Sequence, residues 1–113
     1  MSGAINWRSS WDAALKEAAQ EKRPVVLELY LDGCPHCLKL DQETHSDAAV
    51  AAALNTRFIP VRLEGRGHMD LVRQMQVPGA PTTLIFSPAG QELHRFAGFK
   101  PPQEYLAELK KFG

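Results

Sequence analysis

The sequence lacks an excess of charge of either sign. Thirteen Lys and Arg residues balance thirteen Asp and Glu residues, so the formal net charge is zero. Binding to nucleic acid or to an anionic membrane surface usually requires a basic patch or stripe. We therefore expect neither nucleic acid nor a membrane among the partners of this chain.

A long apolar run is also missing. The most apolar segment, residues 25–31, is much shorter than the roughly 20 residues that cross a bilayer, and Glu28 interrupts it. Residues 1–8 have neither the basic flank nor the apolar core of a signal peptide. These absences predict a soluble, cytoplasmic protein, with the periplasm as the alternative if the chain is the mature domain of a longer precursor.

Cysteine is scarce. The two cysteines, Cys34 and Cys37, both lie in the motif Cys-Pro-His-Cys. A disulfide between them would close too small a loop to stabilise a fold usefully. Since a chain of 113 residues buries enough surface to fold without a structural cross-link, the pair is better interpreted as chemistry.

A zinc site is the structural alternative for this pair. No second Cys-x-x-Cys or paired His motif supplies further ligands. Covalent haem attachment needs a His directly after the second cysteine, where Leu38 stands. We therefore expect no metal and no cofactor, and we expect three of the four scattered histidines at the surface: His45, His68 and His94.

Apolar periodicity and turn residues predict helices that alternate with strands. The first predicted elements are a helix at residues 9–22, a strand at 25–31 and a helix that the cysteine motif opens and that continues to residue 54 with a kink near 45–46. A strand at 57–64, a short helix at 69–75, a hairpin of strands at 82–86 and 92–97, and a helix from residue 101 follow.

The pattern of these elements predicts how the strands are arranged. Residues 25–31 are apolar on both faces, which is typical of a central strand covered on both sides. Pro60 cannot donate a ladder hydrogen bond, so its strand is expected at an edge. Strands joined by helices run parallel and the hairpin is antiparallel. We expect an α/β fold with a central mixed four-stranded β-sheet flanked by helices, formed by residues 1–113 as a single domain.

A Cys-x-x-Cys motif that opens a helix has the requirements of disulfide exchange, which are a thiolate, an accessible sulfur and a second thiol nearby. Unpaired amides and the dipole at a helix start favour the anion of Cys34. Cys37 is expected about one turn on, behind Cys34 and less exposed. Pro35 suits a first helical turn, and a protonated His36 would add positive charge beside Cys34.

Over about residues 22–112 the order of elements and motifs resembles the thioredoxin family. Gly79-Ala80-Pro81-Thr82 is similar to the family's cis-proline motif. The resemblance implies a cis Pro81 beside the active site and an Ala80 backbone that can pair with an extended substrate chain. The alternative is an ordinary turn proline. The expected substrate-binding residues are Gly33, Pro35, Gly79, Ala80 and Pro81.

Glu28 resembles the family's buried acid, which stands six residues before the first cysteine and is usually aspartate. Val26 and Tyr30 share its face of the strand, so burial without a partner would disfavour the ionised carboxylate. A carboxyl that titrates near neutrality can exchange a proton with Cys37. Arg62 falls where the family often has Lys, and simple pairing with Arg62 near the sheet edge is the alternative.

The sequence also departs from the family. Gly33 stands where thioredoxins usually have Trp, and the family's first strand is missing or very short before Trp11. Pro35-His36 between the cysteines resembles the DsbA-type oxidases, but the chain lacks their helical insertion. The sequence is thus interpreted as an atypical thioredoxin with a Gly-Cys-Pro-His-Cys centre.

The resemblance implies a thiol–disulfide oxidoreductase that acts as a protein disulfide reductase, with Cys34, Cys37, Glu28 and His36 as its catalytic residues. A disulfide-forming oxidase or isomerase of the DsbA type and a non-catalytic redox-sensing binding module are the alternatives. The implied partners are disulfide-containing protein substrates and a flavoprotein similar to thioredoxin reductase. We expect the chain to be a monomer.

Overall fold

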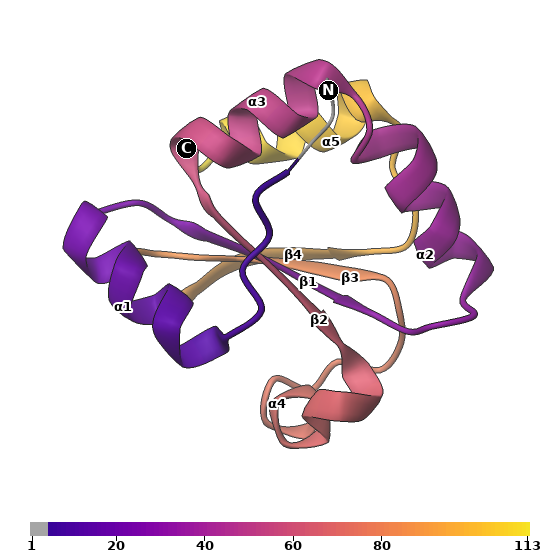
Figure 1. Cartoon of the computed structure of the whole chain (residues 1–113), viewed down its shortest axis with the longest axis horizontal. Helices are drawn as coiled ribbons and strands as arrows, with labels where there is room; N and C mark the ends of the chain where they lie inside the picture. Colours follow the sequence, from indigo (N-terminus) through magenta and orange to yellow (C-terminus); the bar gives the residue numbers. More distant parts are fainter. Residues whose placement is uncertain (1–4) are drawn as a thin grey trace.

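A four-stranded β-sheet lies at the centre of the fold, with helices on both of its faces (Figure 1). The computed structural model describes residues 5–113. The strands are β1 (Val25–Tyr30), β2 (Ile59–Glu64), β3 (Thr82–Phe86) and β4 (Glu92–Ala97). The helices are α1 (Trp11–Glu21), α2 (Pro35–Lys39), the π-helical turn η1 (Leu40–Thr44), α3 (Ala48–Arg57), the 3-10 turn η2 (Gly65–His68), α4 (Met69–Gln74) and α5 (Pro102–Lys110).

The strand order is β2-β1-β3-β4, with β1 parallel to β2 and the other two pairs antiparallel. The prediction of a mixed four-stranded sheet flanked by helices is therefore confirmed, with β1 inside the sheet and β2 at its edge. Pro60 fits this edge because its carbonyl accepts a hydrogen bond from the Arg8 N–H (2.9 Å) on the side away from β1. Arg8 also forms an isolated β-bridge with Val61, and the residues described before α1, 5–10, contain no strand.

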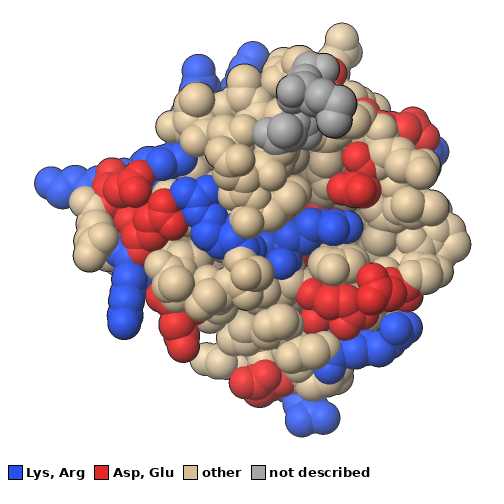
Figure 2. Space-filling view, viewed as in Figure 1, with Lys and Arg blue, Asp and Glu red and all other residues tan. Residues whose placement is uncertain are grey.

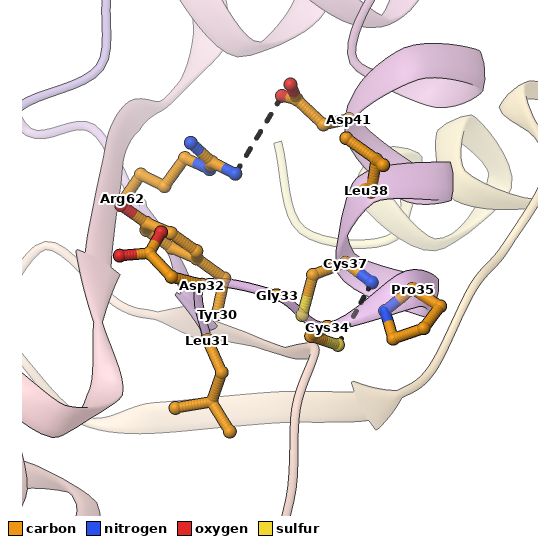
Figure 3. A pocket seen from close by; sticks show the side chains of 10 residues that line it. All are labelled: Tyr30, Leu31, Asp32, Gly33, Cys34, Pro35, Cys37, Leu38, Asp41 and Arg62. Atoms are coloured by element: carbon orange, nitrogen blue, oxygen red, sulfur yellow. Dashed lines mark hydrogen bonds and ion pairs between the residues drawn. The ribbon is translucent and has the colours of Figure 1, made fainter.

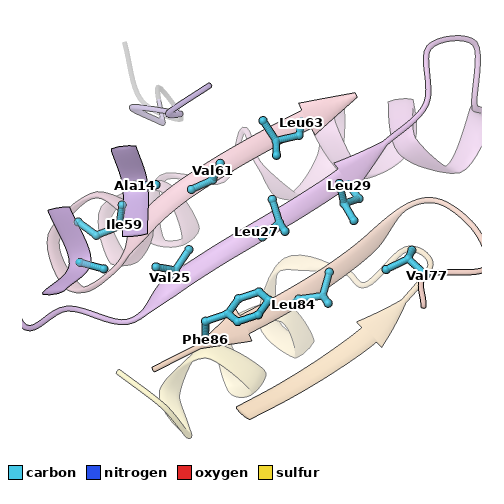
Figure 4. Close-up of a cluster of buried hydrophobic side chains, with 11 residues drawn as sticks. Ala14, Val25, Leu27, Leu29, Ile59, Val61, Leu63, Val77, Leu84 and Phe86 are labelled. Carbon is cyan, nitrogen blue, oxygen red and sulfur yellow. The ribbon is translucent and has the colours of Figure 1, made fainter. Parts of the chain in front are cut away.

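Two hydrophobic clusters, one on each face of the sheet, pack the strands against the helices. The cluster in Figure 4 joins α1 and Val77 to alternate residues of three strands, such as Leu27 and Leu84, with side chains of α4 packed against it. The other face of the sheet packs on α3, α5 and η1. Because side chains alternate between the two faces of a strand, Val26 and Glu28 of β1 face this second set of helices.

The segment after β1 positions most of the site. Residues 35–44 form one helical stretch, in which α2 passes into the π-helical turn η1. The His45 N–H donates to the carbonyl of Leu40, five residues earlier (3.0 Å). The chain then leaves the helix, and the Asp47 carboxylate caps α3 by accepting from the Val50 N–H (3.0 Å). The single helix predicted to continue to residue 54 is therefore interrupted at residues 45–47, at the place of the predicted kink, and α3 is a separate helix.

Charged groups of both signs mix on the surface. On the face in Figure 2, basic side chains form a short band across the centre, and acidic side chains lie close to it on both sides. Within residues 5–113, no helix has both the length and the apolar character needed to cross a bilayer.

Candidate active site

Cys34 stands at the junction between β1 and α2. Gly33 reaches the turn before it with a positive φ of 81°, a conformation that glycine adopts without the steric cost of a side chain. Cys34 is the N-cap of α2, and its Sγ accepts a hydrogen bond from the Cys37 N–H (3.2 Å; Figure 3). A donor aimed at the sulfur stabilises the thiolate. The predicted placement of Cys34 at a helix start is confirmed.

The two thiols differ in exposure. Both cysteines are free, Cys34 is half-buried and Cys37 is buried. Burial raises the pKa of Cys37 to about 12, and the hydrogen bond with Cys34 and the negative charge of Glu28 act in the same direction. Cys37 is therefore a protonated thiol at neutral pH, and it needs a base before it can attack another sulfur.

The loop before β3 lies against Cys34. The Ala80–Pro81 peptide bond is cis, as the resemblance implied, so the alternative of an ordinary turn proline is wrong. The Cys34 thiol donates to the Ala80 carbonyl at a distance of 3.7 Å. Gly79 is exposed, Ala80 half-buried and Pro81 buried, and Thr82 Oγ1 holds the loop by donating to the Gly79 carbonyl (2.7 Å).

Glu28 is fully buried beneath η1, but it has partners. His45 Nε2 lies 2.8 Å from one carboxylate oxygen, and Arg62 Nε lies 3.7 Å from the other. The pairing with Arg62, which the sequence left as the alternative, is therefore present, but Glu28 lies on the internal strand β1 and not near the sheet edge. The Arg62 guanidinium also stacks on the Tyr30 ring, 3.8 Å from its centroid, and reaches Asp41 at 4.0 Å.

His45 corrects a second expectation. It was predicted at the surface, yet its side chain is 3% exposed. Its ring packs against Trp7 and Tyr105, with centroid distances of 5.0 and 5.8 Å. In a regular helix, residue 45 lies about 80° around the axis from Cys37, at the margin of the buried face, and the extra residue of the π turn brings it inward. The i, i+4 spacing of Asp41 and His45 indicates that their side chains meet, but it does not indicate that His45 is buried.

The remaining predicted residues lie at the outer surface of this region. Pro35 occupies the first turn of α2 and is exposed, as is His36. Among residues 5–113, no hydrogen bond or ion pair joins the His36 imidazole to Cys34, so any influence of His36 on the thiolate is through space. His68 and His94 are half-buried rather than fully at the surface.

An open cavity of about 380 Å³ adjoins the two cysteines (Figure 3). Gly33 and Pro35 lie at its cysteine end, and Asp41 and Arg62 line the opposite wall. A second cavity of about 250 Å³ is mostly apolar and reaches the Gly79–Ala80 segment. In the described part of the chain, no group of three or more His, Cys, Asp or Glu side chains is arranged to hold a metal ion.

Comparison with known proteins identifies relatives of this arrangement. A family model described as a thioredoxin-like domain matches residues 11–113. The thiol:disulfide interchange protein DsbD of Ralstonia nicotianae is 31% identical over 107 residues, covering 91% of this chain and 18% of that protein. DsbD of Salmonella typhimurium is 34% identical over 107 residues, covering 89% of this chain and 19% of that protein. The chain thus spans about a fifth of the length of these relatives.

Solved structures share the fold. A thioredoxin from Thermus thermophilus superimposes with a TM-score of 0.86 at 30% identity, covering 98% of this chain and 87% of that chain. The C-terminal domain of DsbD from Neisseria meningitidis, in its reduced form, superimposes with a TM-score of 0.75 at 22% identity. This second alignment covers 90% of the present chain and 93% of the Neisseria domain, and it shows similarity of fold.

Proposed function

Because this chain belongs to the thioredoxin-like family, we propose that it is a thiol–disulfide oxidoreductase that reduces protein disulfides through Cys34 and Cys37. One observation carries the proposal: the half-buried Cys34 sulfur accepts the Cys37 N–H at a helix start, and the buried Cys37 stands directly behind it. A nucleophilic thiolate backed by a resolving thiol is the arrangement that dithiol–disulfide exchange requires.

The reaction proceeds in two displacements. The Cys34 thiolate attacks one sulfur of a substrate disulfide, forms a mixed disulfide and releases the first substrate sulfur as a thiolate. Cys37 then loses its proton and attacks the Cys34 sulfur, so that the enzyme disulfide forms and the second substrate sulfur leaves with its electron pair. The substrate is reduced by two electrons and the enzyme is oxidised by two. We assign the proton transfer from Cys37 to Glu28, whose charge is felt at the Cys37 thiol.

The segment around Pro81 is proposed to hold the substrate chain. The Ala80 carbonyl lies beside the Cys34 sulfur, which places a backbone acceptor next to the reacting atom. An extended peptide that pairs with Ala80 can place its disulfide against Cys34 while its neighbouring side chains enter the apolar cavity at Gly79. Gly33 and Pro35 border the same sulfur from the other side and complete the proposed contact surface.

The reverse reaction, disulfide formation, is a second candidate. Stabilisation of the Cys34 thiolate favours the reduced enzyme and so makes the couple more oxidising. The hydrogen bond from the Cys37 N–H to the Cys34 sulfur favours an oxidising couple in this way. The exposed His36 adds positive charge near the sulfur when it is protonated. The midpoint potential of the Cys34–Cys37 couple against glutathione decides between a reductase and an oxidase.

Partners and compartment follow from the reaction. Disulfide-containing proteins are the proposed substrates, and a flavoprotein similar to thioredoxin reductase remains a predicted electron donor. Protein disulfides persist in oxidising compartments such as the periplasm and are rare in the cytosol. Relatives that interchange thiols and disulfides therefore favour the periplasmic alternative over the cytoplasm. The monomeric state remains a prediction.

Trapping of the mixed disulfide tests the proposed function. Cys37→Ser should accumulate a covalent adduct with a disulfide substrate such as insulin, because the resolving thiol is gone. Cys34→Ser should form no such adduct, because Cys37 is buried and protonated. Non-reducing gel electrophoresis and intact-mass measurement detect the adduct. Insulin reduction at the wild-type rate by both variants would contradict the mechanism.

The binding-module alternative predicts a different result in the same experiment. A module that grips a partner without turnover should show no insulin reduction by the wild-type protein and should form a stable complex with its partner. Turnover by the wild-type protein, with loss of turnover in both single variants, excludes it.

A further inference from the structure

A buried polar cluster behind Cys37 contains a residue to which the two displacements assign no task. Among residues 5–113, Glu28 and His45 are the fully or almost fully buried charge-bearing side chains of this face of the sheet. Their contact is short, at 2.8 Å, yet neither Glu28 oxygen nor His45 Nε2 has a well-aligned hydrogen bond within the described residues. Buried polar atoms in this state are uncommon in folded proteins and call for an explanation.

The two ring nitrogens of His45 face two different carboxylates. Nε2 lies 2.8 Å from Glu28 Oε1, and Nδ1 lies 3.4 Å from Asp41 Oδ1. Glu28 is fully buried, whereas the Asp41 side chain is 44% exposed and lines the cavity beside the cysteines. The imidazole therefore connects a carboxylate that water does not reach with one that water does reach.

An imidazole is suited to this position because one nitrogen can accept a proton while the other releases one. We propose that His45 is a positioning residue that acts through Glu28 and carries the Cys37 proton outward to Asp41 during the resolving step. This inference rests on the proposed function. The proton passes from Cys37 Sγ to Glu28, from Glu28 to His45 Nε2, from His45 Nδ1 to Asp41 and from there to water, while the Cys37 thiolate attacks the Cys34 sulfur.

Several elements pack against His45 and bring charged or polar groups toward its ring. Glu28 faces it from β1, and Asp41 faces it from η1. Tyr105 of α5 packs edge-on against the ring, and burial raises the pKa of this phenol, so it stays neutral. Trp7 closes the remaining side without a charge. Arg62 of β2 lies beyond the ring, against the same two carboxylates.

A single-turnover reaction separates the two displacements. Dithiobis(nitrobenzoate) is an aromatic disulfide whose thiolate product is coloured. The reduced protein should release one coloured thiolate when Cys34 attacks and a second when Cys37 resolves the adduct. The leaving thiolate needs no proton, so the second phase depends on the deprotonation of Cys37.

His45→Gln keeps polar groups beside both carboxylates but cannot take up and release a proton. His45→Phe keeps the ring that packs on Trp7 and Tyr105. In both variants the first phase should stay within twofold of the wild-type rate. The second should slow at least about tenfold, because Glu28 can no longer pass the Cys37 proton on through His45 to Asp41. His94→Gln is the matched control, because His94 also pairs with a glutamate, Glu108 (2.5 Å), outside the cysteine site; both phases should be unchanged.

The pH profile distinguishes a relay from a merely structural contact. The second phase of the wild-type protein should level off across neutral pH. In His45→Gln the outward path for the proton is broken, so the second phase should follow the equilibrium thiolate fraction of Cys37. That fraction grows about tenfold per pH unit below the raised pKa of about 12. Removal of one partner of a buried ion pair can unfold a protein, so near-UV circular dichroism checks each variant. The pH profile of the wild-type protein tests the relay even if the variants do not fold.

The outcomes are distinguishable. A wild-type protein that releases no second thiolate would overturn the proposed dithiol exchange itself. Two phases in the wild-type protein, with wild-type second-phase rates in folded His45→Gln and His45→Phe, would overturn the relay and leave the exchange intact. A wild-type second phase that rises tenfold per unit through neutral pH would also overturn the relay.

Discussion

Cys34 and Cys37 carry the same thiol in different surroundings. Cys34 is half-buried and accepts a backbone N–H, whereas Cys37 is buried with its pKa raised to about 12 by burial first of all. Nucleophilic strength follows the thiolate fraction and access. The order of the reaction, attack by Cys34 and resolution by Cys37, therefore follows from these local environments.

Alkylation measures this difference. With the folded, reduced protein at neutral pH, iodoacetamide should add a single group, at Cys34, and the labelling of Cys37 should increase only as the pH is raised toward 12. Peptide mass spectrometry after timed quenching locates the adducts. In urea both cysteines should label at similar rates, which serves as the control. Equal labelling of both residues in the folded protein at neutral pH would contradict the assignment.

Some residues of the site could be predicted from the sequence and others could not. Cys34 and Cys37 could be identified from their motif, and Glu28 and Arg62 from the resemblance to the thioredoxin family. The structure places Glu28 and Arg62 opposite each other in the parallel pair of strands. Residues that meet only through an irregular backbone could not be placed. His45 belongs to this second group.

At the level of elements, the stretch from α2 to α3 shows why the burial of His45 could not be predicted. Cys37 and Leu40 have the spacing of a regular helix, and the sequence contains no residue that demands a π turn after them. The i to i+5 hydrogen bond from His45 to Leu40 depends on packing between η1 and the sheet, which no local pattern encodes. The sequence analysis extended one helix through Asp47, but Asp is a typical N-cap residue, and Asp47 begins α3.

The N-cap of α3 allows a test at this scale. Asp47→Ala removes the acceptor of the Val50 N–H and should lower the free energy of unfolding by about 1 kcal/mol. Asp47→Asn keeps a side-chain oxygen at the same place and should lower the free energy of unfolding by only a few tenths of the loss in Asp47→Ala. Urea denaturation monitored by circular dichroism measures both variants. Equal losses for Ala and Asn would show that the cap hydrogen bond contributes little.

At the scale of the whole molecule, the sheet brings together residues that are far apart in the sequence. Cys34 follows β1, while Ala80 precedes the antiparallel neighbour β3, so the cysteine and the cis-proline loop meet at one end of the sheet. The topology and the apolar faces of the strands could be predicted, because alternation and turn residues determine them. The positions of the cavities could not be predicted, because side chains from several elements form them.

This convergence predicts a reversible two-electron couple, and a redox titration tests it most directly. The wild-type protein is equilibrated with glutathione buffers of graded potential and then quenched with a reagent that alkylates free thiols. Intact-mass spectrometry counts the alkylated thiols. We expect a single cooperative transition between protein with two alkylated thiols and protein with none, and no intramolecular disulfide in Cys34→Ser or Cys37→Ser. Persistence of two alkylated thiols in the wild-type protein at every potential would contradict it.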